Sequence, residues 1–189
     1  MKNTLRMWIA AGSALAMSLT LAGCAGGDAS SDGTATGGSS SGAGSTGSSF
    51  SGEIPTVLQV RFGDEGEPFA MNLESNATAS AIAGYVADSD WRLPIYHYDD
   101  FEDSDVMQYY DIPSRYEIPS DPQTVTEQHA GEVYYSDPNR IILFYRDAQI
   151  SGEYTKVGEF EPTDDFVNAV IDNPVLEGWG NKIVQIGVE

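Results

Sequence analysis

Cysteine, basic residues and long apolar runs are all scarce in this chain. Its 189 residues include one cysteine, Cys24, so no disulfide can form within the chain and any folded part must be held by an apolar core. Nine lysine and arginine residues stand against 29 aspartate and glutamate residues, which gives a formal net charge of −20 at pH 7. That excess argues against nucleic acid as a partner, because binding to phosphates depends on cationic side chains.

The N-terminal apolar stretch is too short to span a bilayer. Lys2 and Arg6 precede an apolar run over residues 7–19. A membrane-spanning helix needs about 20 apolar residues. A positive start, a short apolar run and small residues before a cleavage point are typical of a secretory signal peptide. We therefore expect residues 1–23 to be a signal peptide. Its removal makes the chain still more acidic, because it contains two basic residues and no acidic residue.

Leu21-Ala22-Gly23-Cys24 follows this run and resembles the lipobox of bacterial lipoproteins. The resemblance implies that Cys24 receives a thioether-linked diacylglycerol, with acyl chains such as palmitate, and becomes the N-terminus after cleavage. Each buried methylene contributes about 0.8 kcal/mol, so two or more acyl chains hold a protein at a membrane. We expect an extracytoplasmic protein that reaches its membrane partner through the lipid on Cys24. Whether that membrane is an inner or an outer one is left open.

Residues 24–52 have the composition of a tether. After Cys24 they are almost entirely glycine, serine, alanine and threonine, and such a segment buries too little apolar surface to offset its chain entropy. A flexible coil of this length reaches roughly 30 Å. We expect a disordered linker here, followed by one domain over residues 53–189, which has the ordinary size of a single domain.

Residues 53–189 alternate between apolar and polar side chains, with turn residues about every ten positions, as short antiparallel strands do. The pattern predicts a mainly β fold, a sandwich or a barrel. Glycine and acidic residues at 63–66 suit the turn of a first hairpin. The expected strands cover residues 56–62, 68–73, 92–98, 106–112, 132–136, 140–146, 156–160 and 181–188.

Two short helices are expected among these strands. Residues 77–86 carry apolar side chains three and four positions apart, as an amphipathic helix does, and Ser75 or Asn76 is suited to cap it. Residues 164–171 follow Thr163, an N-cap residue type, and begin with acidic residues that suit the positive end of the helix dipole.

Residues 129–145 resemble the cyclophilin-like domains of small exported bacterial proteins. They read as a Gly-acidic-apolar strand (HAGEVYY), a proline-containing turn (DPN) and an apolar strand that ends in aromatic residues (IILFY). Residues 76–79 and 154–158 support the resemblance, which covers most of residues 54–188. It implies a closed β-barrel of about eight strands with a helix at each end.

The Phe-Met-x-Gln segment of the proline pocket in cyclophilin isomerases is absent here. Gln128 is the nearest counterpart, but it stands one position further from Gly131 than in the isomerases. Rotation about a prolyl amide has a barrier of about 20 kcal/mol, and lowering it requires accurately placed donors. We therefore expect a binding module without catalytic residues. The alternatives are a peptidyl-prolyl cis-trans isomerase that assists the folding of exported proteins, and a spacer or assembly subunit.

Signatures of other chemistries are also missing. His97 and His129 are the only histidines, and although they and Glu132 are residue types that bind metals, hydrogen-bonded or surface histidines are the simpler interpretation. The acidic run at 99–105 lacks the alternating spacing and the glycine of a calcium loop. Residues 53–189 contain no Gly-x-Ser-x-Gly elbow. We expect no cofactor and no metal site.

Tyrosine is the residue type that points to a binding surface. All ten tyrosines lie in residues 53–189, several adjacent or alternating, so one member of a pair can face the core while the other faces outward. Exposed rings beside an arginine would form a groove for a peptide, a glycan or a small-molecule ligand. The alternative is that the rings only pack the fold. The candidate ligand-binding residues are Tyr98, Tyr110, Arg115, Tyr116, His129, Tyr135 and Trp179.

Lipidation at one sulfur predicts how the chain partitions on cell fractionation. Cys24→Ser is expected to move the protein from the membrane to the soluble fraction, because the chain has no second cysteine to acylate. Intact-mass analysis of the native protein should show the added lipid. As a control, Cys24→Ser combined with Ser31→Cys keeps a cysteine outside the lipobox and should remain soluble. An unmodified thiol in the native membrane-bound protein would contradict the prediction.

Overall fold

The computed structural model describes residues 53–188. The predictions for the signal peptide, for Cys24 and for the linker fall outside these residues and stay predictions. Within the described part, no helix is long and apolar enough to cross a membrane.

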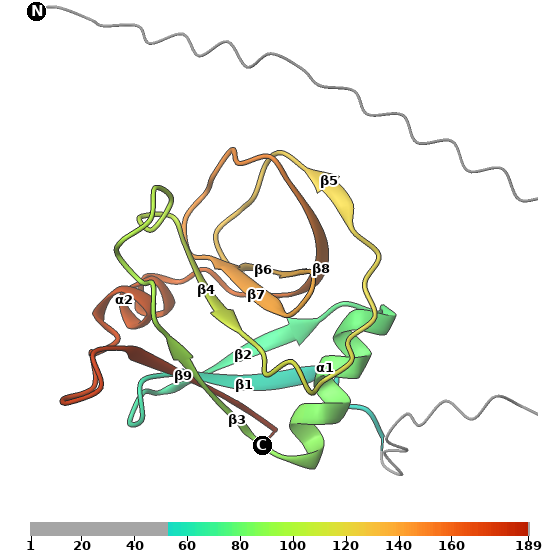
Figure 1. Cartoon of the computed structure of the whole chain (residues 1–189), viewed down its shortest axis with the longest axis horizontal. Helices are drawn as coiled ribbons and strands as arrows, with labels where there is room; N and C mark the ends of the chain where they lie inside the picture. Colours follow the sequence, from blue (N-terminus) through green and yellow to red (C-terminus); the bar gives the residue numbers. More distant parts are fainter. Residues whose placement is uncertain (1–52, 189) are drawn as a thin grey trace, which may run out of the picture. The chain divides into compact units, whose positions relative to one another are not determined.

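The described residues form nine strands and two helices (Figure 1). All eight predicted strands and both predicted helices are present, with bounds that differ by a few residues, so the expected mainly β fold is confirmed. In chain order the elements are β1 (Val57–Phe62), β2 (Pro68–Leu73), α1 (Ala77–Asp88), β3 (Trp91–Ile95), β4 (Met107–Asp111), β5 (Gln123–Val125), β6 (Glu132–Ser136), β7 (Arg140–Phe144), β8 (Gly152–Phe160), α2 (Asp164–Asp172) and β9 (Lys182–Gly187).

One antiparallel sheet runs in the order β3-β9-β1-β2-β8-β6-β7-β4, and β5 pairs only with β8. The edge strands β3 and β4 come close to each other but share no ladder, so the expectation of a closed barrel is wrong. Pro94 in β3 lacks a backbone N–H, which agrees with its place in an edge strand. The helices α1 and α2 lie toward opposite ends of β1 and β9 (Figure 1).

The main core lies inside the curved sheet. It takes alternate side chains from the strands, and the helices contribute Ile82 and Phe166, both fully buried. Phe62, Phe160 and Phe166 pack with ring centroids 4.8 to 6.4 Å apart. The buried residues of this core within the described part run from Leu58 to Ile186.

A second, smaller apolar cluster lies on the other face of β6 and β7. Tyr134, Ile142 and Phe144 are covered there by side chains of β5, of β8 and of the segment 148–150. This cover explains why β7 is an unbroken apolar run instead of an alternating one: a strand that is buried on both faces has no polar face. The sequence pattern missed β5 because none of its three residues is buried.

Candidate binding site

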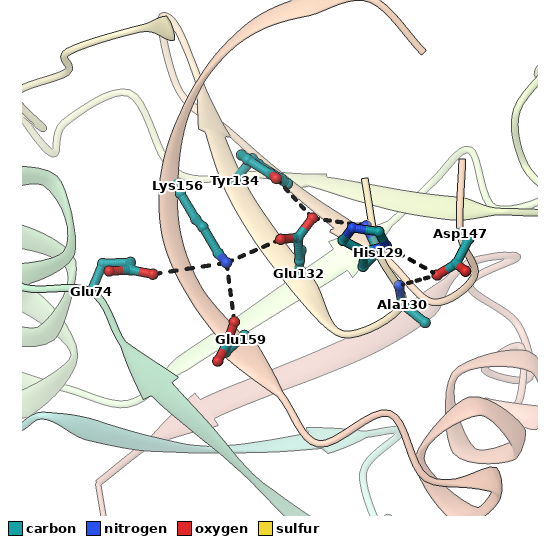
Figure 2. Close-up of polar contacts among 8 residues, drawn as sticks. All are labelled: Glu74, His129, Ala130, Glu132, Tyr134, Asp147, Lys156 and Glu159. Carbon is teal, nitrogen blue, oxygen red and sulfur yellow. Dashed lines mark hydrogen bonds and ion pairs between the residues drawn. The ribbon is translucent and has the colours of Figure 1, made fainter. Parts of the chain in front are cut away.

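The carboxylate of Glu132, at the start of β6, is the centre of a polar cluster on the outer face of the sheet (Figure 2). One oxygen accepts from Lys156 Nζ at 3.0 Å. The other accepts from the Tyr134 hydroxyl and from the His129 backbone N–H, both at 2.8 Å. Lys156 also reaches Glu159 at 3.0 Å and lies 3.9 Å from Glu74. The side chain of Glu132 thus accepts three hydrogen bonds, from His129, Tyr134 and Lys156.

A tight turn over residues 129–132 aims Glu132 at this cluster. Gly131 has a φ of +95°, which favours glycine, and a Cβ atom there would collide with the carbonyl oxygen of Phe160. The Gly131 backbone N–H donates to Phe144 at 2.8 Å, and its carbonyl accepts from Phe160 at 2.9 Å. The turn is therefore wedged between the ends of β7 and β8.

The protonation state of Glu132 follows from these contacts. Burial by itself would raise its pKa, but the His129 N–H, Lys156 and the Tyr134 hydroxyl outweigh that effect, so the pKa lies below the ordinary value of 4.5. For Lys156, burial opposes the charge, yet bonds to Glu132 and Glu159 raise its pKa. Both groups are thus charged at neutral pH, and Glu132 is the anchor that holds His129, Tyr134 and Lys156 together.

A hollow of about 460 Å³ opens beside Lys156, between the N-terminus of α1 and the segment 119–123. Its walls are fixed by side chains that bond to backbone. Thr78 Oγ1 donates to the Pro119 carbonyl at 2.7 Å, and Thr155 Oγ1 accepts from the Asp121 N–H at 2.9 Å. Asn76, the N-cap of α1, donates to the Lys156 carbonyl at 2.8 Å. The volume is within the range of small-ligand sites.

The charge in this hollow is negative. Glu74 and Asp121 line it and are exposed, and the carboxylate of Asp121 has only a long 3.4 Å contact with Gln123. Lys156 is the sole cation among the lining residues, and Glu132 and Glu159 already neutralise it. In residues 53–188, Asp121 pairs with no cation, and Glu74 has only its 3.9 Å contact with Lys156.

The seven ligand-binding candidates from the sequence do not form one groove. Tyr110 and Tyr135 are only 2% and 1% exposed and pack in the main core, so the expectation that they face a binding surface is wrong. The Tyr135 hydroxyl donates to the Pro138 carbonyl. Burial in the core raises the pKa of Tyr110 far above its usual value.

The other candidates occupy separate places. Tyr116 packs between Tyr85 and Trp91, and Arg115 lies over its ring at 4.6 Å. Tyr98 lies beneath the ammonium of Lys182. His129 has an exposed side chain near Asp147, and Trp179 is 72% exposed on a loop.

Gln128, the counterpart of the isomerase glutamine, has no free amide group. Its Nε2 donates to the Ile150 carbonyl at 2.6 Å, and its Oε1 accepts from the Ile150 N–H at 3.1 Å. Gln128 thus holds the cover of the second apolar cluster. In residues 53–188 no three His, Cys, Asp or Glu side chains converge closely enough to hold a metal ion.

Sequence reasoning missed Glu74, Asp121 and Lys156, which border the hollow. One signal was available: Lys156 is one of only two lysines after Lys2, and a rare cation flanked by carboxylates in sequence is a natural ion-pair centre. The positions of Glu74 and Asp121 depend on contacts between distant segments and left no local pattern.

The fold and the hollow together define a small β domain with a helix toward either end of its sheet and a walled surface site beside α1. A family model described as the cyclophilin-like family matches residues 62–181. The chain belongs to this family, which confirms the resemblance carried by residues 129–145.

Two further comparisons concern individual proteins. One solved structure, described as "Structure of McbB in complex with tryptophan", is similar to the chain at a TM-score of 0.49 and 12% sequence identity, over 70% of this chain and 44% of that one. This chain thus spans less than half the length of that structure. No curated protein sequence matches the chain.

The Glu132 cluster predicts a stability change that depends on pH. Glu132→Gln should lower the free energy of unfolding by roughly 1–3 kcal/mol at pH 7, because an amide cannot accept from all three donors. Since the folded pKa of Glu132 is depressed, its contribution is present above pH 4.5 and is lost as the pH falls through the folded value. Urea unfolding at pH 7 and at pH 3 should show the difference shrink.

Glu159→Gln is the matched control for this measurement. Glu159 contacts the same lysine at the same 3.0 Å, but its side chain is 57% exposed, against 15% for Glu132. Exposed ion pairs contribute about 0–1 kcal/mol, so Glu159→Gln should have a small effect. Equal losses in the two variants would show that Glu132 is no anchor.

Proposed function

We propose that this chain is a lipid-anchored binding module of the cell envelope, held outside the cytoplasm by Cys24, that recognises a cationic ligand without catalysis. The observation that carries the ligand class is the hollow beside α1. There Lys156 is neutralised by Glu132 and Glu159, Glu74 has only a 3.9 Å contact with it, and Asp121 pairs with no cation in residues 53–188. A ligand that brings an amine or a guanidinium would supply the opposite charge. A small molecule and a lysine or arginine side chain of a peptide both meet this requirement.

The use of cations elsewhere in the domain supports this choice. Each of the seven lysine and arginine side chains in residues 53–188 donates a hydrogen bond within the protein. Arg92 and Arg140 are bound to single carboxylates, those of Asp64 and Asp111. Far more carboxylates than cations are present, so most have no basic partner in the fold. An approaching cation is attracted, and an anion is repelled.

The rigidity of the hollow also favours binding. Its walls are linked by hydrogen bonds from Thr78, Asn76 and the Asp121 N–H, all between segments distant in sequence. A site whose walls are already ordered loses less conformational entropy when a ligand enters. Selectivity for positive charge would then come from Glu74 and Asp121.

A pair of isosteric probes tests the ligand class. N-acetyl-arginine amide carries a guanidinium, and N-acetyl-citrulline amide replaces it with a neutral urea of the same shape. In ¹H–¹⁵N NMR titrations of residues 24–189 carrying Cys24→Ser, we expect saturable shifts at the amides of residues 76–78, 120, 121 and 123 with the arginine probe only. Asp121→Asn and Glu74→Gln should each weaken binding by about three- to tenfold, and salt should weaken it further.

Glu65→Gln is the control variant, because Glu65 is an exposed carboxylate in the turn between β1 and β2 and does not line the hollow. Equal shifts with both probes would refute recognition by charge. A loss in Glu65→Gln as large as in Asp121→Asn would attribute binding to the overall charge of the domain instead of the hollow.

Prolyl isomerisation is the activity that separates this proposal from its alternative. Because the amide of Gln128 is bonded to Ile150, the same protein should leave the isomerisation rate of a proline test peptide unchanged in a protease-coupled assay. Acceleration that Arg115→Ala abolishes would establish the isomerase alternative and defeat a binding-only function. Gln128→Ala is not informative here, because it also removes the bonds that hold Ile150.

A further inference from the structure

Trp179 is the most exposed large apolar residue of the described part, at 72%. It stands between Gly178 and Gly180, which both have positive φ values, of +81° and +71°, and no heavy atom lies near the position of a Cβ at either glycine. The loop is nevertheless ordered by its own backbone: the Leu176 N–H donates to the Asn181 carbonyl at 2.9 Å, and the Trp179 N–H donates back to Leu176 at 3.2 Å. The fold thus displays this indole on a defined loop.

Three more exposed apolar residues belong to the same end of the sheet. Tyr96 is 68% exposed, Val175 44% and Ile171 38%. Tyr96 directly follows Ile95, which pairs with Lys182, and Lys182 Nζ donates to the Ile171 carbonyl at 2.9 Å. These bonds join the end of β3, the end of α2 and the start of β9. We call Tyr96, Ile171, Val175 and Trp179 the α2-end surface; they are four of the seven exposed large apolar residues in residues 53–188.

The charges around the α2-end surface are negative. Residues 171–181 include Asp172 and Glu177 and no lysine or arginine, and both acidic side chains are exposed. Asp99 and Asp172 lie close enough to Lys182 for their charges to act on it, while Lys182 itself is 9% exposed. A cation at the base of the surface is therefore covered, and the rim presents carboxylates.

We propose that the α2-end surface docks a basic, apolar segment of another protein, with Trp179 as the anchoring side chain. Tryptophan is enriched among residues that dominate binding energy at interfaces, and the acidic rim selects a partner that carries lysine or arginine beside its apolar residues. A second copy of this chain brings the same acidic rim and is repelled. An anionic lipid surface is repelled for the same reason. This surface is separate from the hollow beside α1, with which it shares no residue.

Tryptophan fluorescence reads this surface directly. Residues 24–189 with Cys24→Ser contain Trp91, which is 4% exposed, and Trp179, so a change on binding reports Trp179. The probe is a synthetic peptide of about 12 residues built from lysine and leucine. We expect a saturable blue shift of the emission that salt reduces and that Trp179→Phe abolishes. Peptides of the same pattern with glutamate for lysine, or with serine for leucine, should produce none.

Affinity variants locate the peptide. By anisotropy of a labelled Lys/Leu peptide, Trp179→Ala should weaken binding by about tenfold or more, and Tyr96→Ala by a smaller factor. Ile54→Ala is the matched control, since Ile54 is 46% exposed and lines a separate depression near the start of α1. Because Trp179 lies on an exposed loop, circular dichroism and the thermal midpoint should be unchanged in Trp179→Ala.

Several results would overturn the proposal. Unchanged affinity in Trp179→Ala, or equal binding of the Glu/Leu peptide, would exclude an anchored basic partner. If Asp121→Asn weakened peptide binding and Trp179→Ala did not, the peptide would bind in the hollow beside α1. A blue shift that appears with phosphatidylglycerol vesicles but not with the peptide would assign the surface to lipid. A blue shift that grows with protein concentration in the absence of peptide would assign the α2-end surface to a second copy of the chain.

Discussion

The turn over residues 129–132 is the point on which the described structure depends. Through Gly131 it bonds to the last residue of β7 and the last residue of β8 at once, and through Glu132 it ties the start of β6 to Lys156. β6 pairs with both β7 and β8, and the turn adds bonds to the ends of both strands at a position that has no room for a Cβ atom. Lys156 forms part of the wall of the hollow, so the bond from Lys156 to Glu132 connects the hollow to the turn.

The scarcity of cations determines the electrostatics of the surface. Every lysine and arginine of residues 53–188 is already bonded within the protein. The acidic excess is therefore not offset at the surface, and both proposed binding surfaces are negative. They differ in the groups they offer. The exposed lining of the hollow is more apolar than polar, and Glu74 and Asp121 add carboxylates to it, which suits a small cation that also carries apolar groups. The α2-end surface presents an indole and a phenol ring, which suits a larger partner.

Local sequence patterns predicted eight of the nine strands and both helices, but not the site. Alternation predicted strands such as 68–73, and residue type placed the helix N-caps at Ser75 or Asn76 and at Thr163, since both effects depend on near neighbours. Closure of the sheet was predicted wrongly, because it depends on whether β3 and β4 pair across the whole chain. Burial of Tyr110 and Tyr135 was missed because adjacent tyrosines leave the inward-facing member undetermined. The hollow joins residues about 80 positions apart, such as Asn76 and Lys156, which no local pattern reveals.

Glu132 links the stability of the fold to the sign of the charge in the hollow. While Glu132 is ionised, it neutralises Lys156 and leaves Glu74 and Asp121 to set the local potential. If Glu132 is protonated, Lys156 loses its least exposed partner and keeps Glu159 and the more distant Glu74, so its charge weighs more against a cationic ligand in the hollow. The contacts from His129, Tyr134 and Lys156 lower the pKa of Glu132, and so keep the hollow negative well below neutral pH. A buried ion pair often adds little stability; here its orientation also keeps the ammonium from occupying the place of the ligand.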